Sequence, residues 1–269
     1  MPRFRRSGIW WLSVLIGLGS VHAQMPFYTD DPGVTDPKTL HVEIFDEYDG
    51  LQSSQYPDLR QNTADFKISY SPVRTLELDL DTPYVSIYRA PDNQTSRGLG
   101  DTNLGAKWNI RETPADTTLP AFAVSFYVEF PTGNSQEGLG SGFTDYWLNF
   151  VVQKPLSEAT RVNVNLGMLF AGTTSTGTEG IQTRHEQVFT GGISLLHDAT
   201  SRLTWGAEIY GAIADGTGSG KTQLQGMLGA QYAIRNGLSL CAGILGGKYG
   251  GTPQVGAQIG VSIDFPGVL

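Results

Sequence analysis

The sequence predicts an all-β protein: an antiparallel transmembrane up-and-down β-barrel of about twelve strands. Apolar and polar residues alternate with a period of two in one segment after another, which is typical of strands with one apolar and one polar face. Long polar connections take turns with short ones, as in a barrel whose outer loops exceed its inner turns. The composition agrees, because 34 Gly accompany 12 Phe, 11 Tyr and 5 Trp while the mean hydropathy is only −0.17.

Residues 1–23 have the features of a cleaved secretory signal peptide. Arg3, Arg5 and Arg6 precede an apolar stretch over 9–18, and Val21-His22-Ala23 forms a small-residue cleavage site. The apolar stretch is shorter than the roughly 18–20 residues that a membrane-spanning helix needs. We therefore expect cleavage after Ala23 and export to the cell outer membrane of a Gram-negative bacterium.

The next segment, 24–38, is rich in Pro and Asp and shows no strand pattern. Two placements are open for it. It either folds into the lumen as a plug or lies in the periplasm.

The β-barrel is predicted over 39–265. Its clearest strand has Phe or Val at every even position from 122 to 130, and mostly small or polar residues at the odd positions. Twelve segments of this kind occur, at 39–50, 62–72, 75–89, 101–112, 119–131, 144–156, 160–172, 186–198, 202–214, 222–235, 238–249 and 253–265. The residues after Phe265 are expected to form a C-terminal tail, 266–269, because Pro266 cannot extend a ladder.

The connections predict the orientation. Outer loops are expected around 50–61, 90–100, 132–143, 173–185, 215–221 and 248–252, where Gly, Ser, Thr, Asn and Gln gather. Tight inner turns are expected at 71–74, 156–159, 197–201 and 235–237, the last with the Asn-Gly pair that favours a hairpin. An even number of strands places both chain ends in the periplasm.

The polar face of the strands is predicted to line a wet lumen, while the apolar face contacts outer-membrane lipid. A β-sandwich is the main alternative, but its dry core would have to pair too many buried polar groups. The lumen-facing candidates are Glu43, Lys67, Glu77, Asp79, Lys107, Arg111, Glu129, Asn163, Asn165, Glu208, Gln225, Gln231, Gln258 and Asp264.

Aromatic residues near the strand ends are interpreted as two interfacial girdles, in which amphipathic rings lie among lipid headgroups. The alternative for any of them is a place along a solute path. The residues concerned are Tyr70, Tyr84, Tyr88, Trp108, Tyr146, Trp147, Trp205 and Tyr232.

Several kinds of site are not expected. The net charge of −8 argues against nucleic-acid binding. No His pair has close ligand spacing and Cys241 has no neighbouring Cys or His, so no metal, cofactor or catalytic centre is predicted. The stretch 215–222 ends in Gly-Lys-Thr, but it starts with Asp215 where a phosphate-binding loop needs Gly, and we interpret it as a surface loop.

Two short motifs resemble those of a known family. They are Phe27-Tyr28-Thr29-Asp30-Asp31-Pro32-Gly33 and the step Gly98-Leu99-Gly100-Asp101 before a strand that contains Lys107-Trp108. Together they resemble the outer-membrane family named "putative MetA pathway of phenol degradation". The resemblance implies a barrel associated with uptake of small, often aromatic compounds.

The sequence therefore favours a passive channel, not an enzyme, for a small and possibly aromatic solute. The alternative is a non-conducting structural or adhesive outer-membrane barrel. A membrane-embedded hydrolase that uses Ser141 and His185 is a third hypothesis. The sequence leaves the oligomeric state open.

Overall fold

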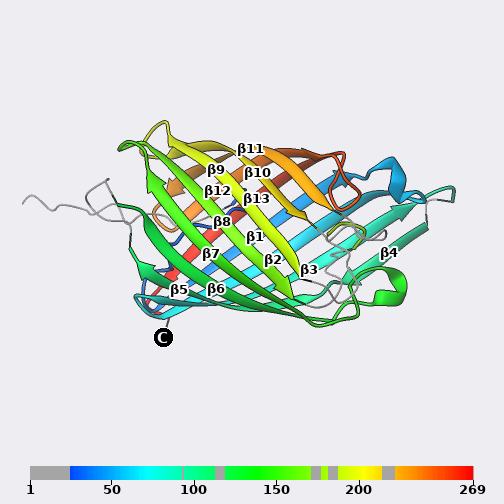
Figure 1. The fold of residues 1–269 in the computed structure, drawn as a ribbon, viewed down its shortest axis with the longest axis horizontal. Helices are drawn as coiled ribbons and strands as arrows, with labels where there is room; N and C mark the ends of the chain where they lie inside the picture. The colour runs from blue at the N-terminus through cyan, green and yellow to red at the C-terminus, as the bar shows by residue number, and fades with distance from the viewer. Residues whose placement is uncertain are drawn as a thin grey trace, which may run out of the picture.

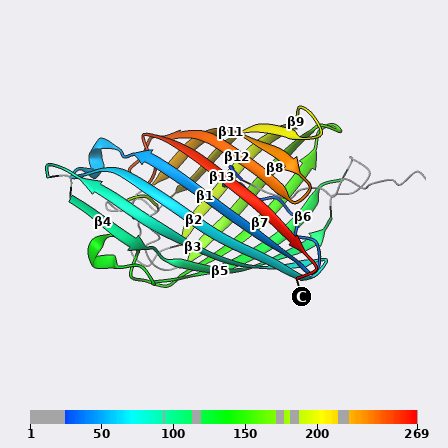
Figure 2. The ribbon, with the colours of Figure 1, turned by 180° about the vertical axis from the view of Figure 1, so that it is seen from behind.

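The structure, a computed structural model, describes residues 25–92, 94–112, 119–170, 177–180, 187–213 and 222–268. The described strands form one antiparallel sheet that closes into a barrel, as Figure 1 and the reverse view in Figure 2 show. Sequential strands are neighbours except that β5 pairs with β3 and not with β4; β1 pairs with β13, and pairing of β2 with β3 closes the ring. The predicted twelve-stranded antiparallel barrel is confirmed.

The strands run as follows: β1 Thr39–Gly50, β2 Asp58–Val73, β3 Leu76–Arg89, β4 Gln94–Leu99, β5 Thr102–Arg111, β6 Ala121–Phe130, β7 Asp145–Pro155, β8 Thr160–Phe170, β9 Val188–Asp198, β10 Leu203–Ile213, β11 Gln223–Arg235, β12 Leu238–Gly247 and β13 Val255–Pro266. Two short 3-10 helices, η1 Ser53–Gln55 and η2 Ser135–Glu137, lie in connections between them. No helix among the described residues is long and apolar enough to cross a membrane.

Strands β4 and β5 together complete one position in the barrel wall. β5 pairs with the first half of β3, from Leu76 to Asp81, and β4 pairs with its second half, from Tyr84 to Arg89. The wall therefore has twelve positions although thirteen strands are present. The break falls at Gly100-Asp101, where the Asp101 carboxylate accepts hydrogen bonds from the N–H groups of Gly133 and Ser141 in the next long connection.

Two predicted boundaries are wrong at the end of the barrel that carries the long loops. Residues 94–99 were expected in a loop but form β4, and β2 begins at Asp58 instead of residue 62. Most side chains of β4 are exposed, so this segment shows no alternation of apolar and polar residues. Its ladder with β3 rests on backbone hydrogen bonds, which need no apolar face.

The two faces of the wall have opposite polarity. In β5, Leu104 and Trp108 are 52% and 60% exposed on the outer face, whereas Lys107 is 3% exposed on the inner face. Apolar side chains turned outward suit lipid, and polar ones turned inward suit a wet lumen. A soluble domain would have the reverse arrangement.

The short turns lie at the end of the barrel where the C-terminus lies (Figure 1). Gly237 has φ +71° in the predicted Asn-Gly turn between β11 and β12, a conformation that glycine adopts at little cost. β13 includes Pro266, one residue beyond the predicted end, and the N–H groups of Gly267 and Val268 donate to the Lys38 carbonyl. The beginning and the end of the barrel chain are thus tied together.

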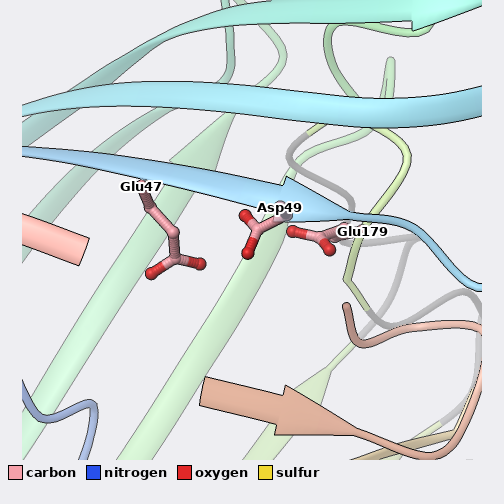
Figure 3. Close-up of side chains that lie close together, drawn as sticks. All are labelled: Glu47, Asp49 and Glu179. Carbon is pink, nitrogen blue, oxygen red and sulfur yellow. The ribbon is translucent and has the colours of Figure 1, made fainter. Parts of the chain in front are cut away.

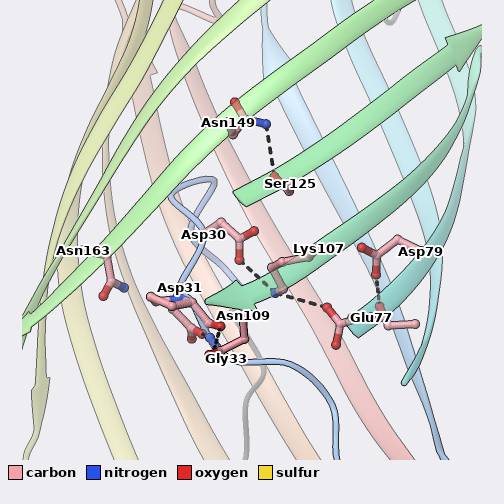
Figure 4. A network of polar contacts seen from close by, with 12 residues as sticks. Asp30, Asp31, Gly33, Glu77, Asp79, Lys107, Asn109, Ser125, Asn149 and Asn163 are labelled. Carbon is pink, nitrogen blue, oxygen red and sulfur yellow. Dashed lines mark hydrogen bonds and ion pairs between the residues drawn. The ribbon is translucent and has the colours of Figure 1, made fainter. Parts of the chain in front are cut away.

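The segment from Met25 to Thr35 lies inside the barrel, and the exposed residues 36–38 lead from it to the end of the wall that carries the short turns. They join β1 at Thr39, and hydrogen bonds connect the segment to inner-face side chains of several strands, among them Glu77 and Glu208. In Figure 4 this segment passes between the strands beside Lys107 and Asn109. Of the two placements that the sequence left open, the structure has the one in the lumen.

Candidate functional site

The N-terminal segment, residues 25–38, divides the lumen and provides one side of the candidate site. The Glu208 carboxylate accepts hydrogen bonds from the backbone N–H groups of Tyr28 and Thr29. At the other end of the segment, the Glu77 carboxylate accepts from both the N–H and the hydroxyl of Thr35, each at 2.6 Å. These contacts satisfy backbone N–H groups that have no partner in the pairing of the strands.

Lys107 links this segment to the wall. Its ammonium group lies 3.2 Å from Asp30 Oδ1 and 3.1 Å from Glu77 Oε1, and its side chain is only 4% exposed (Figure 4). Two positions along β5, Asn109 donates to the Pro32 carbonyl at 2.6 Å. Consecutive inner-face residues of one strand therefore hold the acidic part of the N-terminal segment.

The first residues of the segment pack against glycines of β11 and β13. A Cβ at Gly229 would lie 2.3 Å from Pro26 Cγ, and one at Gly260 would lie 2.6 Å from Met25 Cε. Both glycines belong to inner faces, so the missing side chains leave the space that Met25 and Pro26 fill. The wall is thus shaped to receive this segment.

All but one of the sequence-predicted lumen candidates lie on the inner side of the wall, to different degrees. The half-buried ones are Lys67, Arg111, Gln231 and Asp264. The buried ones are Glu43, Glu77, Asp79, Lys107, Glu129, Asn163, Asn165, Glu208, Gln225 and Gln258. Arg111 is the exception, because a bulge in β5 shifts the register and pairs it with Phe122, which stacks on Phe150 on the outer face.

Several of these candidates contact each other or the N-terminal segment. Lys67 Nζ lies 3.8 Å from Glu43 Oε2, and the Tyr127 hydroxyl donates to Asp79 at 2.9 Å. Elsewhere Gln153 donates to Asn163 at 2.9 Å. Asn165, in the amide orientation that satisfies both partners, pairs with the backbone N–H and carbonyl of Asp30.

A cavity of about 220 Å³ opens beside the N-terminal segment. Four aromatic side chains line it, together with amides, hydroxyls and charged groups; the lining residues are Tyr28, Asp30, Lys67, Asp81, Ser125, Tyr127, Trp147, Asn149, Asn165, Thr190, Gly191 and Tyr210. Tyr28 and Tyr210 stack with ring centroids 6.0 Å apart. Ligand sites combine apolar and aromatic walls with a few placed polar groups in this way.

A family model that matches almost the whole chain identifies the family. The family model described as "Putative MetA-pathway of phenol degradation" matches residues 7–265. The chain belongs to this family. Among curated proteins, none matches the chain significantly.

Solved structures share the fold of this family member. The COG4313 outer-membrane channel from Pseudomonas putida F1 has a TM-score of 0.66 at 14% identity, covering 87% of this chain and 98% of that one. The KdgM porin has a TM-score of 0.56 at 10% identity, covering 84% and 99%. The NanC porin has 0.54 at 11%, covering 82% and 98%. The closed barrel with its apolar outer face is the arrangement of an outer-membrane protein.

Sequence reasoning missed part of the cavity lining of this family member. Trp147 was expected in a lipid-facing girdle, but it lies on the inner face and lines the cavity. Trp147 is two residues from Asn149 along β7, and Tyr210 is two residues from Glu208 along β10, so each pair lies on the same face of its strand. The alternation of faces could therefore have predicted that Trp147 and Tyr210 point into the lumen. Tyr28 lies in a segment without periodicity, where no such signal exists.

Ser141, one of the two residues that the hydrolase hypothesis requires, has a structural role. The Ser141 hydroxyl donates to the Phe143 carbonyl at 3.0 Å and accepts from the Phe143 N–H at 3.1 Å. These contacts stabilise the long connection between β6 and β7. His185 lies outside the described residues.

Proposed function

We propose that this protein is a passive outer-membrane channel for small solutes and not an enzyme. The observation that carries the proposal is the cavity inside the closed barrel, lined by aromatic rings and polar groups. Membership of the family and the shared fold of outer-membrane channels support it. The described structure suggests no energy source, so the solute would move down its own gradient.

The solute class we propose is a small aromatic compound with a polar substituent. Pockets for drug-sized ligands have volumes of about 300–1,000 Å³. A cavity of about 220 Å³ suits something smaller, such as a single substituted ring. The tyrosine and tryptophan rings would contact its faces, and Asn149 or Thr190 would bond the polar group. The family's name, which refers to phenol degradation, agrees with this class.

The N-terminal segment would act as a constriction, and the lumen-facing candidates would set the preference for solutes. After removal of residues 1–23, the new N-terminus would lie close to Met25 and the segment could remain inside the barrel. We place both chain ends in the periplasm and the long loops outside a Gram-negative cell, in contact with outer-membrane lipid through the apolar face. This orientation follows from the lengths of the connections.

Flux measurements test the proposal. Purified protein is reconstituted in liposomes, and the uptake of phenol-like compounds is compared with that of aliphatic alcohols of equal size. We expect faster uptake of the aromatic compounds than in protein-free liposomes, together with small single-channel conductance in planar bilayers.

The alternatives predict other results in the same preparation. An absence of both conductance and flux would favour a structural or adhesive barrel, for which the segment across the lumen is the supporting observation. Esterase activity that is lost in Ser141→Ala would instead favour the hydrolase.

A further inference from the structure

Three carboxylates converge at the long-loop end of the lumen. Glu47 and Asp49 project from the inner face of β1, and Glu179 comes from the short segment 177–180 of the connection between β8 and β9 (Figure 3). One oxygen of each lies within 4.8 Å of the others. Glu47 is 6% exposed and Asp49 is fully buried.

The surrounding structure holds these groups in place. The Gln61 side-chain carbonyl accepts from the Thr178 N–H at 2.7 Å, and the Thr178 hydroxyl donates to Asp58 at 2.9 Å. Gly180 is tied to the connection between β12 and β13 through the Gly251 carbonyl. Across from Asp49 stands Gly256, where a Cβ would lie 1.9 Å from Asp49 Oδ1. The carboxylate therefore occupies space that only glycine leaves.

Two polar groups at this place lack a partner. Neither oxygen of the buried Asp49 carboxylate accepts a hydrogen bond. The Gln258 amide donates to Glu47 Oε2 at 3.1 Å, yet its own oxygen is buried without a donor. No lysine or arginine in the described ranges forms an ion pair with Glu47 or Asp49. Buried carboxylates without a counter-charge are strongly unfavourable, so such a cluster either takes up protons or binds a cation.

We propose that Glu47, Asp49 and Glu179, beside the Gln258 amide, form a binding site for a divalent cation. All available ligands are oxygens, which hard cations prefer. Three side chains from two separate segments favour Ca²⁺, whose coordination is flexible, over Mg²⁺, which demands near-ideal octahedral geometry and keeps its waters.

The bound ion would join three parts of the molecule. It would tie segment 177–180 to β1, and the Tyr28 hydroxyl, which donates to Glu47 at 2.5 Å, would connect it to the N-terminal segment. Calcium would thereby stabilise the arrangement that narrows the lumen. The site itself does not depend on whether the barrel conducts.

Calorimetric titration of the full mature chain in detergent, after removal of metals with a chelator, tests the site. We expect binding of about one Ca²⁺ per chain, a higher midpoint of thermal unfolding with Ca²⁺ than without it, and weaker binding of Mg²⁺. Asp49→Asn and Glu179→Gln should each weaken Ca²⁺ binding at least about tenfold. Without Ca²⁺, Asp49→Asn should unfold no earlier than the wild type, because it removes a buried like charge.

Asp145→Asn is the matched control. Asp145 is also fully buried, and neither of its oxygens has a hydrogen-bond partner, but it belongs to no group of three close carboxylates in the described chain. Its variant should bind Ca²⁺ as the wild type does. The proposal fails if the wild type shows neither binding nor a thermal shift, or if Asp145→Asn loses as much affinity as the two site variants.

Discussion

Trp147 is the one tryptophan among the residues that line the lumen cavity. If the cavity selects aromatic solutes, Trp147→Ala should lower the ratio of aromatic to aliphatic flux several-fold, because one aromatic contact contributes about 0.5–1.5 kcal/mol. Aliphatic flux itself should not fall, since the variant enlarges the cavity. Liposome uptake measures both rates.

Trp205 supplies the control for this change. It is 49% exposed on the outer face of β10, so Trp205→Ala removes the same side chain without touching the cavity. An unchanged flux ratio in Trp147→Ala, or an equal loss in both variants, would contradict a role of the cavity in selection.

Lys107 is the residue on which the acidic part of the N-terminal segment depends. Lys107→Met leaves Asp30 and Glu77 close together without their cation, so we expect a loss of roughly 3 kcal/mol in the free energy of unfolding. Arg161→Met breaks a pair whose side chains are 29% and 38% exposed, and should cost less than about 1 kcal/mol. Urea unfolding in micelles compares the two variants. Equal losses in the free energy of unfolding would show that the buried position of Lys107 does not strengthen its ion pairs.

Strand alternation determined which residues could be placed from the sequence. Glu77, Asp79 and Lys107 lie on regular strands, and period two was enough to assign them to the inner side. The same rule would place Trp147 on the inner side. We predicted a lipid interface instead, because tryptophan is common there, and that prediction was wrong. Contacts such as that of Lys107 with Asp30 depend on the fold of a non-periodic segment, which no pattern in the sequence encodes.

At the scale of elements, the N-terminal segment is held by shape as well as by charge. Gly229→Val places a branched side chain where a Cβ alone would lie 2.3 Å from Pro26. Because the wall is a rigid ladder and the segment is not, we expect the segment to move. Single-channel recording should then show a larger conductance than in the wild type.

Gly226→Val is the control in the same strand. Gly226 is exposed, and a Cβ there would meet only the Glu208 carbonyl at 3.6 Å, an ordinary contact. This variant should conduct as the wild type does. If Gly229→Val folds and leaves the conductance unchanged, the segment is not the constriction.

The bounds of strands whose outer face is apolar could be predicted from the sequence. The bounds of strand segments without an apolar face could be predicted less well. β1 spans the expected residues, because its apolar face must meet lipid and its register is fixed accordingly. β4 pairs with the second half of β3. Most side chains of β4 are exposed, so its sequence shows no alternation of apolar and polar residues. The ends of strands at the loop side therefore follow backbone hydrogen bonding, which the side-chain sequence does not show.

At the scale of the whole molecule, the lumen carries an excess of negative charge. The buried acidic side chains among the described residues are Glu43, Glu47, Asp49, Glu77, Asp79, Asp101, Glu129, Asp145 and Glu208, whereas Lys107 is the single buried lysine. The whole chain has a net charge of −8, so the outer surface does not reverse this field. Charge of one sign along a pore attracts the opposite ion and repels its own.

We therefore expect cation selectivity from the open channel. In planar bilayers with a KCl gradient, the reversal potential should have the sign of preferential K⁺ passage, and the preference should decrease at high salt because screening shortens the reach of the lumen charges. Glu208→Gln removes one of these charges at the N-terminal segment and should reduce the preference, whereas the exposed Glu158→Gln should not. Anion preference in the wild type would show that Lys67 and Lys107, not the carboxylates, control the path that ions take.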